Sequence, residues 1–377
     1  MKKILLGMIA LLATSCGSEK IQVEINNPSA AFRNHETIEL LWSDITQRLP
    51  EIAPETIVVL DEEHEQVPSQ VTYEGLAEPQ RLIFQVSLPG EGKAVYTIQK
   101  GEREKYPVQV FGRFVPERSD DYAWENNLTA YRVYGPALKN PQTPGIDVWV
   151  KSTERMIIDD WYAGKDYHTD HGDGMDAYKV GPTLGGGASA PWAYGKLWLS
   201  GNYAKQERLD NGPIRTTVRL TYSPAPLGDG DEEGQYNFSK VISLDANSYF
   251  NKITDTYAGT YESCSIAAGI ALHDVKERVS GNDYIAVTEA LSDSKQPEID
   301  GDISLAVILP GAHKSEMADR HLVVSKRMDN GEPMTYWSGS AWSKAGKVTD
   351  FDTWQAIVRE KREQIENPLV VYFLVYE

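Results

Sequence analysis

The sequence predicts a mainly β protein, in which a small immunoglobulin-like β domain precedes a large antiparallel β-sandwich. Strand-like runs recur along the whole chain, and turns rich in glycine, proline and asparagine separate them. One long segment, Thr353 to Gln364, has apolar residues at helical spacing, with Trp354, Ile357 and Val358 on one face. Many short strands with one late helix are typical of β-sandwich proteins.

The first residues have the features of a lipoprotein signal peptide. A short positive start is followed by an apolar run, Ile4 to Ala13, that is too short to span a bilayer. Small residues then lead into Cys16, as a lipoprotein signal peptidase requires. We therefore expect a signal peptide at residues 1–15, lipidation of Cys16 and a tether at residues 16–20. The expected location is the cell envelope, at the periplasmic face or the outer surface of the outer membrane. An ordinary secreted protein with an incidental cysteine is the alternative.

The chain has two cysteines, so lipidation of Cys16 leaves Cys264 without a partner. This excludes an internal disulfide and a multi-cysteine metal site. Cys264 lies in a strand-like apolar stretch, where we expect it to be a small buried side chain.

The formal net charge of −18 argues against binding of nucleic acid or of a long polyanion. A locally basic pocket for one terminal acidic sugar remains compatible with this charge. The 20 tyrosines and 9 tryptophans suit sugar rings, but they also suit any large β-sandwich.

The small domain is expected at residues 21–105. Its strand-like runs alternate in polarity or are rich in β-branched residues, and the segment Thr37 to Leu49 resembles a short amphipathic helix. A charged connection at residues 100–105 marks the boundary. The runs lie at residues 21–25, 56–60, 82–86 and 94–98.

The large β-sandwich is expected at residues 106–377. Its length exceeds that of the first domain about threefold, and it contains the predicted late helix. Its strand-like runs lie at residues 128–134, 146–151, 196–199, 214–222, 240–244, 265–272, 303–309, 321–325 and 370–376.

Familiar catalytic signatures are absent, and the densest polar cluster is a glycine-rich loop at residues 165–179. It contains His168 and His171 among several aspartates. Three interpretations are open. The loop is a solvated acidic turn, a divalent metal site built on the two histidines and an aspartate, or a sugar pocket with His or Tyr as acid and base. The sequence itself requires no cofactor.

Chemistry on an acidic sugar also needs cations. Arg132 and Arg215 fall in strand-like segments, and an arginine fork matches a carboxylate in two places. Lys179 and Lys196 are further candidates, although a surface ion pair is the alternative for each cation. His273, at the end of an apolar strand, either faces the same pocket or is a satisfied edge histidine.

Several segments together resemble an uncharacterised-domain family of lipoproteins and secreted proteins from glycan-degrading Gram-negative bacteria. The resemblance covers roughly residues 106–377. It implies a carbohydrate-active β-sandwich of the galactose-mutarotase-like type and a dehydratase or lyase that acts on terminal uronates in pectin or ulvan utilisation. It supplies no catalytic residues. The segments are residues 112–127, 131–136, 145–149, 167–174, 178–182 and 211–215.

These features lead to a hypothesis of β-elimination at a non-reducing-end uronate, giving a 4,5-unsaturated sugar. Two alternatives remain, a glycan-binding lipoprotein without catalysis and a glycoside hydrolase with two opposed carboxylates. In the elimination, Arg132 and Arg215 bind the substrate carboxylate, and His168 and His171 act as base and acid. Tyr178 is the alternative proton donor, and Lys179 orients the leaving oxygen. The remaining substrate contacts come from Tyr134, His273 and Trp124. The hydrolase would draw its carboxylates from Asp173, Asp176, Glu125 and Glu262.

Overall fold

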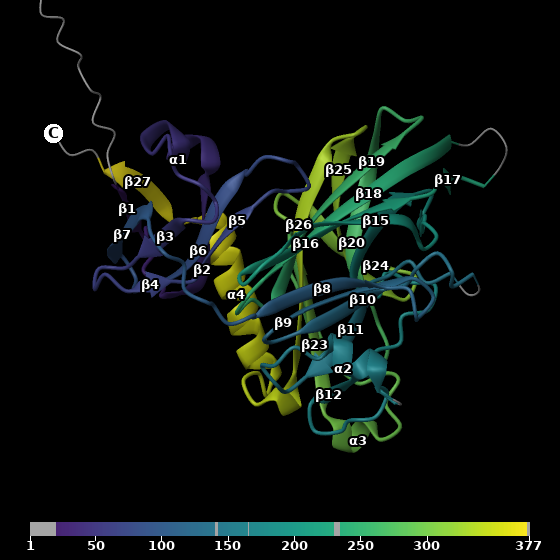
Figure 1. The fold of residues 1–377 in the computed structure, drawn as a ribbon. Coiled ribbons are helices and arrows are strands. Elements are labelled where there is room, and N and C mark those ends of the chain that lie inside the picture. Colours follow the sequence, from purple (N-terminus) through teal and green to yellow (C-terminus); the bar gives the residue numbers. More distant parts are fainter. Residues whose placement is uncertain (1–19, 140–141, 165, 230–233, 375–377) are drawn as a thin grey trace, which may run out of the picture.

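The computed structural model describes residues 20–139, 142–164, 166–229 and 234–374. Two β bodies lie side by side, and one long helix runs along the junction between them (Figure 1). The predicted fold class, a β-sandwich preceded by a small β domain, is confirmed. The signal peptide and Cys16 lie outside the described residues and stay predictions.

The small body is a sandwich of two antiparallel sheets, with strand orders β27-β1-β7-β3-β4 and β2-β6-β5. The alternating residues of β1 place Ile21, Val23 and Ile25 inside, because side chains of a strand point to opposite faces in turn. The elements are β1 (Lys20–Asn26), β2 (Arg33–Leu41), α1 (Trp42–Arg48), β3 (Ile57–Leu60), β4 (Gln66–Val67), β5 (Ser69–Thr72), β6 (Arg81–Leu88), β7 (Lys93–Lys100) and β27 (Val370–Leu374).

The predicted helix at Thr37 to Leu49 is wrong in its first half. Residues up to Leu41 belong to β2, which pairs with β6, and the helix α1 begins only at Trp42. The buried Ile38 and Leu40 satisfy a period of two as well as part of a helical pattern. Pairing with β6 decides between the two, since it satisfies the backbone groups of β2 in the sandwich.

The last strand, β27, does not lie in the large body. It pairs with β1, and Leu369, Val371 and Phe373 pack against the core of the small body. The prediction of a strand at residues 370–376 is confirmed as far as Leu374. The prediction that this strand belongs to the sandwich of residues 106–377 is wrong, because the chain returns to the first domain through the long helix (Figure 1).

The large body is built on a nine-stranded antiparallel sheet of order β15-β16-β18-β19-β26-β23-β22-β21, with β17 paired to β18. A five-stranded sheet, β14-β13-β20-β25-β24, packs on one of its faces, and one large apolar core lies between them. The strands are β13 (Gly186–Ala193), β14 (Lys196–Leu197), β15 (Tyr203–Asn211), β16 (Arg215–Tyr222), β17 (Ala225–Leu227), β18 (Gly234–Asp245), β19 (Phe250–Gly259), β20 (Ser263–Ala271), β21 (Val275–Ser280), β22 (Tyr284–Ala290), β23 (Asp302–Ile308), β24 (Lys314–Ala318), β25 (His321–Asp329) and β26 (Pro333–Trp342).

A third sheet, of order β12-β11-β10-β9-β8, covers the rest of the same face of the nine-stranded sheet. Trp124 of this sheet donates to Asn251, and Ser189 of β13 donates to Asp255. Asn251 and Asp255 are four residues apart on β19, so they point to one side. The elements are β8 (Val110–Val115), β9 (Asp121–Asn126), β10 (Ala130–Val133), β11 (Asp147–Lys151), β12 (Gly174–Asp176) and the short helices α2 (Ile158–Ala163), α3 (Pro297–Asp300) and η1 (Ser343–Ala345).

The predicted late helix is confirmed as α4 (Phe351–Glu366), which covers part of the opposite face of the nine-stranded sheet. Its Trp354 is fully buried, stacks on Phe250 at 5.6 Å between ring centroids and donates its indole N–H to Leu305 O at 3.1 Å. Asp350 is the N-cap, and its carboxylate accepts from the backbone N–H of Thr353 at 2.8 Å.

Removal of this cap gives a measurable prediction. We expect Asp350→Ala to lower the free energy of unfolding by about 1 kcal/mol, because one backbone N–H of the first turn loses its acceptor. Asp350→Asn retains an acceptor oxygen and should stay close to the wild type. Urea denaturation followed by circular dichroism measures both, and equal midpoints for Asp350→Ala and wild type would contradict the role of the cap.

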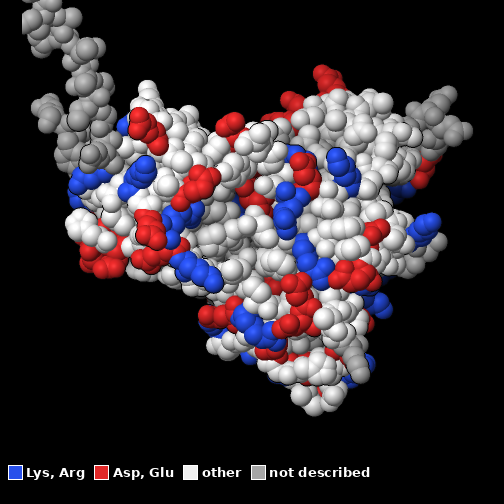
Figure 2. Space-filling model, in the orientation of Figure 1, with Lys and Arg blue, Asp and Glu red and all other residues white. Residues whose placement is uncertain are grey.

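No helix within the described residues is long and apolar enough to cross a membrane. Cys264 is a free, buried thiol, as predicted. On the face of the molecule in Figure 2, acidic and basic side chains alternate over both bodies, so neither sign dominates this surface.

Candidate functional site

The β8–β12 sheet carries a buried cluster of charges centred on Arg132. The Arg132 side chain is 2% exposed; it donates to Asp147 Oδ2 at 2.8 Å and to Asp176 Oδ2 at 2.6 Å. Its guanidinium also lies over the rings of Tyr134 and Trp149, at 4.7 and 5.2 Å. The prediction that Arg132 receives a substrate carboxylate does not fit this geometry, because two protein carboxylates already occupy its donors. Arg132 instead holds those carboxylates in place.

This cluster contains more carboxylates than arginines. Asp121, Asp147 and Asp176 surround Arg132, and Arg118 is the second cation, 3.3 Å from Asp121 Oδ2. Burial, together with the carboxylate of Asp147, raises the pKa of Asp176 to about 8 against the opposing effect of Arg132. Burial likewise raises the pKa of Asp121 to about 6. The cluster therefore holds a proton at neutral pH.

Two buried carboxylate oxygens of the cluster, Asp121 Oδ2 and Asp147 Oδ1, have no hydrogen-bond partner within the described residues. Asp147 Oδ2 accepts from Arg132, from the Trp149 indole and from the Tyr134 hydroxyl at 3.3 Å. An unpaired buried acceptor is costly, and such atoms concentrate at functional sites.

His168 is the solvent-exposed end of this cluster, on the loop between α2 and β12. The carboxylate of Asp166 accepts from the backbone N–H of His168 at 3.1 Å and from the Thr169 hydroxyl at 2.8 Å, which shapes the loop. His168 Nδ1 lies 3.0 Å from Asp176 O and 3.6 Å from Asp176 Oδ2. Because a carbonyl oxygen only accepts, Nδ1 carries the proton and Nε2 of the neutral ring keeps its lone pair. The side chain is 45% exposed, so this base is accessible.

Arg118 is linked to His168 through Tyr167 and was missed in the sequence. Its guanidinium is 5.2 Å from the Tyr134 ring centroid and 31% exposed, and it contacts Tyr167, whose ring lies 4.7 Å from the His168 ring. Arg118 therefore presents an accessible fork that the predicted Arg132 lacks. In the sequence it stands within residues 112–127, but nothing in that motif distinguishes it from a surface arginine.

The turn that carries Arg118 is strained. Ser119 and Asp120 both have positive φ, at 51° and 60°, a region that residues other than glycine rarely adopt. The backbone at Gly135 packs so closely that an added Cβ would lie 1.8 Å from Asp120 O. Such strain costs about 1–3 kcal/mol per residue and is found at ligand sites and active sites.

Tyr178 and His273, two further residues of the predicted site, lie close to each other. Tyr178 is buried and donates its hydroxyl to Ala271 O at 3.0 Å, and the edge of its ring meets His273 at 5.2 Å. His273 Nδ1 lies 2.8 Å from Glu289 Oε1, and the His273 side chain is 20% exposed. Burial, with the charges of Glu289 and Asp147, raises the pKa of Tyr178 well above its usual value. Because the Tyr178 hydroxyl is buried and already donates to Ala271 O, it does not fit the role of an alternative proton donor.

Two predicted residues are exposed and lie outside the buried cluster. His171 Nε2 lies 3.0 Å from Asp166 O, so its ring bonds the backbone of its own loop. Lys179 has an exposed side chain, and its backbone N–H donates to Ser292 Oγ at 2.9 Å. Lys196, another cation of the sequence prediction, pairs with Asp229 at the surface.

Two further predicted residues lie elsewhere. Trp124 is 1% exposed, donates to Asn251 Oδ1 at 2.7 Å and stacks on Tyr131, so it is a core residue and not a surface for sugar. Arg215 lies at the junction of the two bodies, where Asp245 and Glu39 accept from its guanidinium at 2.6 to 2.8 Å. Its donors are used, as those of Arg132 are.

The carboxylates considered for a glycoside hydrolase do not form an opposed pair. Glu125 is fully buried, 2.6 Å from Lys151 Nζ, and accepts from the backbone of residues 157 and 158. Asp173 pairs with Arg155, and Glu262 is exposed in the hairpin between β19 and β20. Within the described residues, no group of three or more histidine, cysteine or acidic side chains is placed to hold a metal ion.

The raised pKa of Asp176 predicts a pH effect on stability. The folded state keeps a proton that the unfolded chain loses above about pH 4, so this group lowers the free energy of unfolding as the pH rises from about 4 to about 8. Asp176→Asn should remove that dependence while keeping an oxygen for Arg132. We expect the melting temperature of wild type to fall more between about pH 5 and pH 9 than that of the variant. If the melting temperatures of wild type and variant changed equally with pH, Asp176 would ionise normally in the folded state.

Comparison with known proteins places the whole chain in one family. The domain described as "Domain of unknown function (DUF4861)" matches residues 25–371, which includes both β bodies. "Uncharacterized protein P7" of Formosa agariphila is 30% identical over 406 aligned positions, which cover 96% of each chain. The family match therefore also covers the small body, which the resemblance noted in the sequence, at roughly residues 106–377, did not include.

Two solved structures from Enterococcus faecalis are similar in fold. A protein in the glycosyl hydrolase family 38 matches with a TM-score of 0.50 and 9% identity, over 96% of this chain and 48% of that one. An α-mannosidase matches with a TM-score of 0.47 and 8% identity, over 96% and 46%. The chain thus spans about half the length of these two solved chains.

Proposed function

The chain belongs to the DUF4861 domain family, and we propose that it is an envelope enzyme that eliminates water from the terminal uronate of an acidic oligosaccharide. The observation that carries the proposal is the half-exposed His168, oriented by the Asp176 carbonyl, with the partly exposed Arg118 on the other side of the Tyr167 ring. Elimination at a uronate needs at least an oriented base and a nearby cation that is accessible to the substrate carboxylate. The fold shared with a glycosyl hydrolase family 38 protein supports a sugar as the ligand class.

The proposed reaction begins at C5 of the uronate. Arg118 binds the substrate carboxylate, which withdraws charge from the C5–H bond and makes its proton more acidic. His168 Nε2 takes this proton, and the C–H electron pair forms the C4–C5 double bond. The C4–O bond breaks, and the departing hydroxyl takes a proton and leaves as water. The products are a 4,5-unsaturated sugar and one water molecule.

The buried cluster has a separate part in this proposal. When His168 gains a proton, its Nδ1–H keeps donating to the backbone carbonyl of Asp176 at 3.0 Å, which holds the ring in the same orientation. The pKa of Tyr134 is raised well above its usual value by burial and by Asp147, so its hydroxyl stays protonated and is a donor for the leaving oxygen.

The test uses the soluble protein from residue 20 onward with uronate-terminated oligosaccharides of pectin, ulvan and glucuronan. A conjugated C4–C5 double bond adds ultraviolet absorbance, and mass spectrometry should show the loss of one water from the substrate. New reducing ends without absorbance would replace elimination by hydrolysis. Binding without any turnover would leave a glycan-binding lipoprotein as the function.

A further inference from the structure

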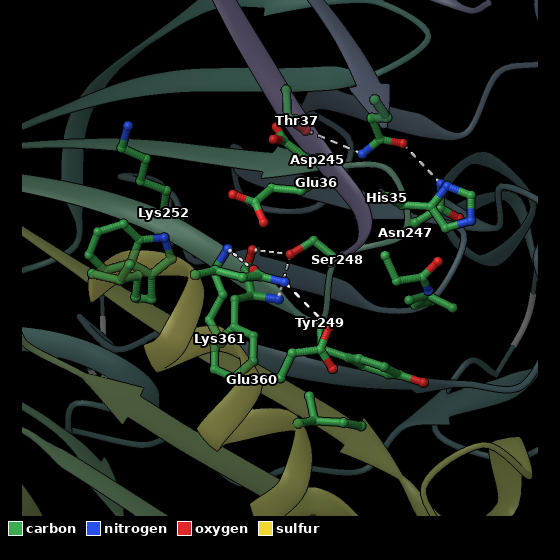
Figure 3. Close-up of a pocket in the computed structure, with 18 of the residues that line it drawn as sticks. His35, Glu36, Thr37, Asp245, Asn247, Ser248, Tyr249, Lys252, Glu360 and Lys361 are labelled. Carbon is green, nitrogen blue, oxygen red and sulfur yellow. Dashed lines mark hydrogen bonds between the residues drawn. The ribbon is translucent and has the colours of Figure 1, made fainter. Parts of the chain in front are cut away.

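A cavity that is separate from the His168 site lies between the two β bodies. It has a volume of about 660 Å³, within the range of small-molecule sites, and such sites prefer domain interfaces. Its walls come from β2 of the small body, from the ends of β16, β18 and β19, and from α4 (Figure 3). We refer to it as the interdomain pocket.

The interdomain pocket lies on the face of the nine-stranded sheet that the other two sheets leave open. Asn251 and Asp255 of β19 point toward those sheets, so Lys252 between them points to the opposite side and lines the pocket. Polar contacts hold the two bodies together at the edge of the pocket. Arg215 pairs with Glu39 at 2.6 Å, and Gln85 of the small body donates to Ala246 O at 2.8 Å.

Several charged groups in the pocket are weakly paired. Lys361 Nζ donates a hydrogen bond to Gln364 Oε1 at 3.2 Å and has no ion pair within 4 Å in the described part of the chain. Glu36 reaches Arg33 only at 3.5 Å. Figure 3 shows Glu36 on β2 and Glu360 and Lys361 on α4 around the same space. Burial lowers the pKa of Lys361 and raises the pKa of Glu36 and Glu360.

The remaining lining includes neutral polar and aromatic side chains that suit a sugar ring. Amide and hydroxyl side chains provide both donors and acceptors, and aromatic residues provide flat apolar surface. A polyhydroxylated ring can satisfy both at once, whereas a purely apolar ligand would leave the polar groups unpaired. The neutral polar residues are Asn34, Thr37, Gln85, Ser243, Asn247 and Ser248, and the aromatic ones are Tyr249, Phe250 and Trp337.

We propose that the interdomain pocket is a second binding site, separate from the His168 site, and that it takes a small sugar acid with one carboxylate. The ammonium of Lys361 binds the carboxylate, since that cation has no protein carboxylate within ion-pair distance. Glu36 and Glu360 accept from ring hydroxyls, and Trp337 or Tyr249 packs against the ring face. A ligand held by β2 and α4 together would also tie the two bodies to each other.

The binding experiment uses the His168→Ala protein, so that turnover does not consume the ligand. Glucuronate and galacturonate are titrated by calorimetry at about pH 8, with glucose and acetate as probes that carry only the hydroxyls or only the carboxylate. We expect the sugar acids to bind more tightly than either probe. Adding Lys361→Gln should weaken them by about tenfold or more, because a charge-assisted contact is lost. Adding Lys196→Gln, which removes a remote surface lysine, should leave the affinity unchanged.

A variant with the opposite expected sign guards against loss of binding through misfolding. Glu360→Gln keeps an acceptor oxygen for a ring hydroxyl but removes a negative charge near the bound carboxylate, so it should strengthen binding of the sugar acid. Equal binding of glucose and glucuronate, or unchanged affinity in Lys361→Gln, would overturn the proposal. So would absence of any binding to the His168→Ala protein, whereas that result would not affect elimination by wild type.

Discussion

Replacing His168 with alanine is expected to reduce turnover of a uronate-terminated oligosaccharide about 10²- to 10⁴-fold, the usual contribution of a positioned acid or base. The Michaelis constant should change little, because Arg118 and Tyr134 remain to bind the substrate. The folded state should survive, since the His168 side chain is 45% exposed and its ring bonds only a backbone carbonyl. Initial rates of ultraviolet absorbance measure the effect.

Two comparisons separate this role from a general effect of the loop. His171→Ala alters the same loop, but its ring bonds the loop backbone and lies outside the charge cluster, so we expect a loss of less than about tenfold. Added imidazole should restore part of the activity of His168→Ala and none of any loss in Arg118→Ala. Full activity of His168→Ala would exclude this residue as the base.

The second large effect is expected at the buried ion pair of Lys240 and Asp255 in the main core. Their side chains are 1% and 0% exposed, and Lys240 Nζ lies 2.6 Å from Asp255 Oδ2. The hydroxyls of Ser189 and Tyr336 also donate to Asp255. Asp255→Ala leaves Lys240 without a counter-charge in the core and should cost about 3–5 kcal/mol of unfolding free energy. Chemical denaturation measures this cost.

An exposed pair on the same sheet is the matched control. Arg219 and Glu207 lie 3.0 Å apart, with side chains 40% and 45% exposed. Glu207→Ala should change the unfolding free energy by less than about 1 kcal/mol, because water screens this pair. Similar costs for Asp255→Ala and Glu207→Ala would mean that Lys240 reaches water or gives up its proton without penalty.

Strand positions could be predicted because a strand that is buried on one face has apolar side chains at every second residue. Ile21 to Ile25 alternate strictly and form β1, and the β-branched run at 57–60 forms β3. The late helix was predictable for the same kind of reason, since Trp354 and Val358 share its buried face. Where periods of two and 3.6 overlap, as at Ile38 and Leu40, the sequence alone did not distinguish strand from helix.

The candidate site was predicted in part. The loop at residues 165–179 was identified from its concentration of histidine and aspartate, and His168 does border a charge cluster there. The assignment of Arg132 and Arg215 as substrate ligands failed on a property that sequence does not carry. Whether an arginine is free depends on carboxylates that are distant in the chain, such as Asp176 for Arg132 and Glu39 for Arg215.

By itself, the sequence determined the β class, most strand positions, the late helix and the location of a polar loop rich in histidine and aspartate. These follow from local periodicity and composition, which each short segment carries on its own. Only the tertiary structure decided which charges are already paired, that the last strand joins the first domain, and that a pocket opens between the two bodies. Pairing, burial and cavities depend on residues that are far apart along the chain, so folding alone brings them together.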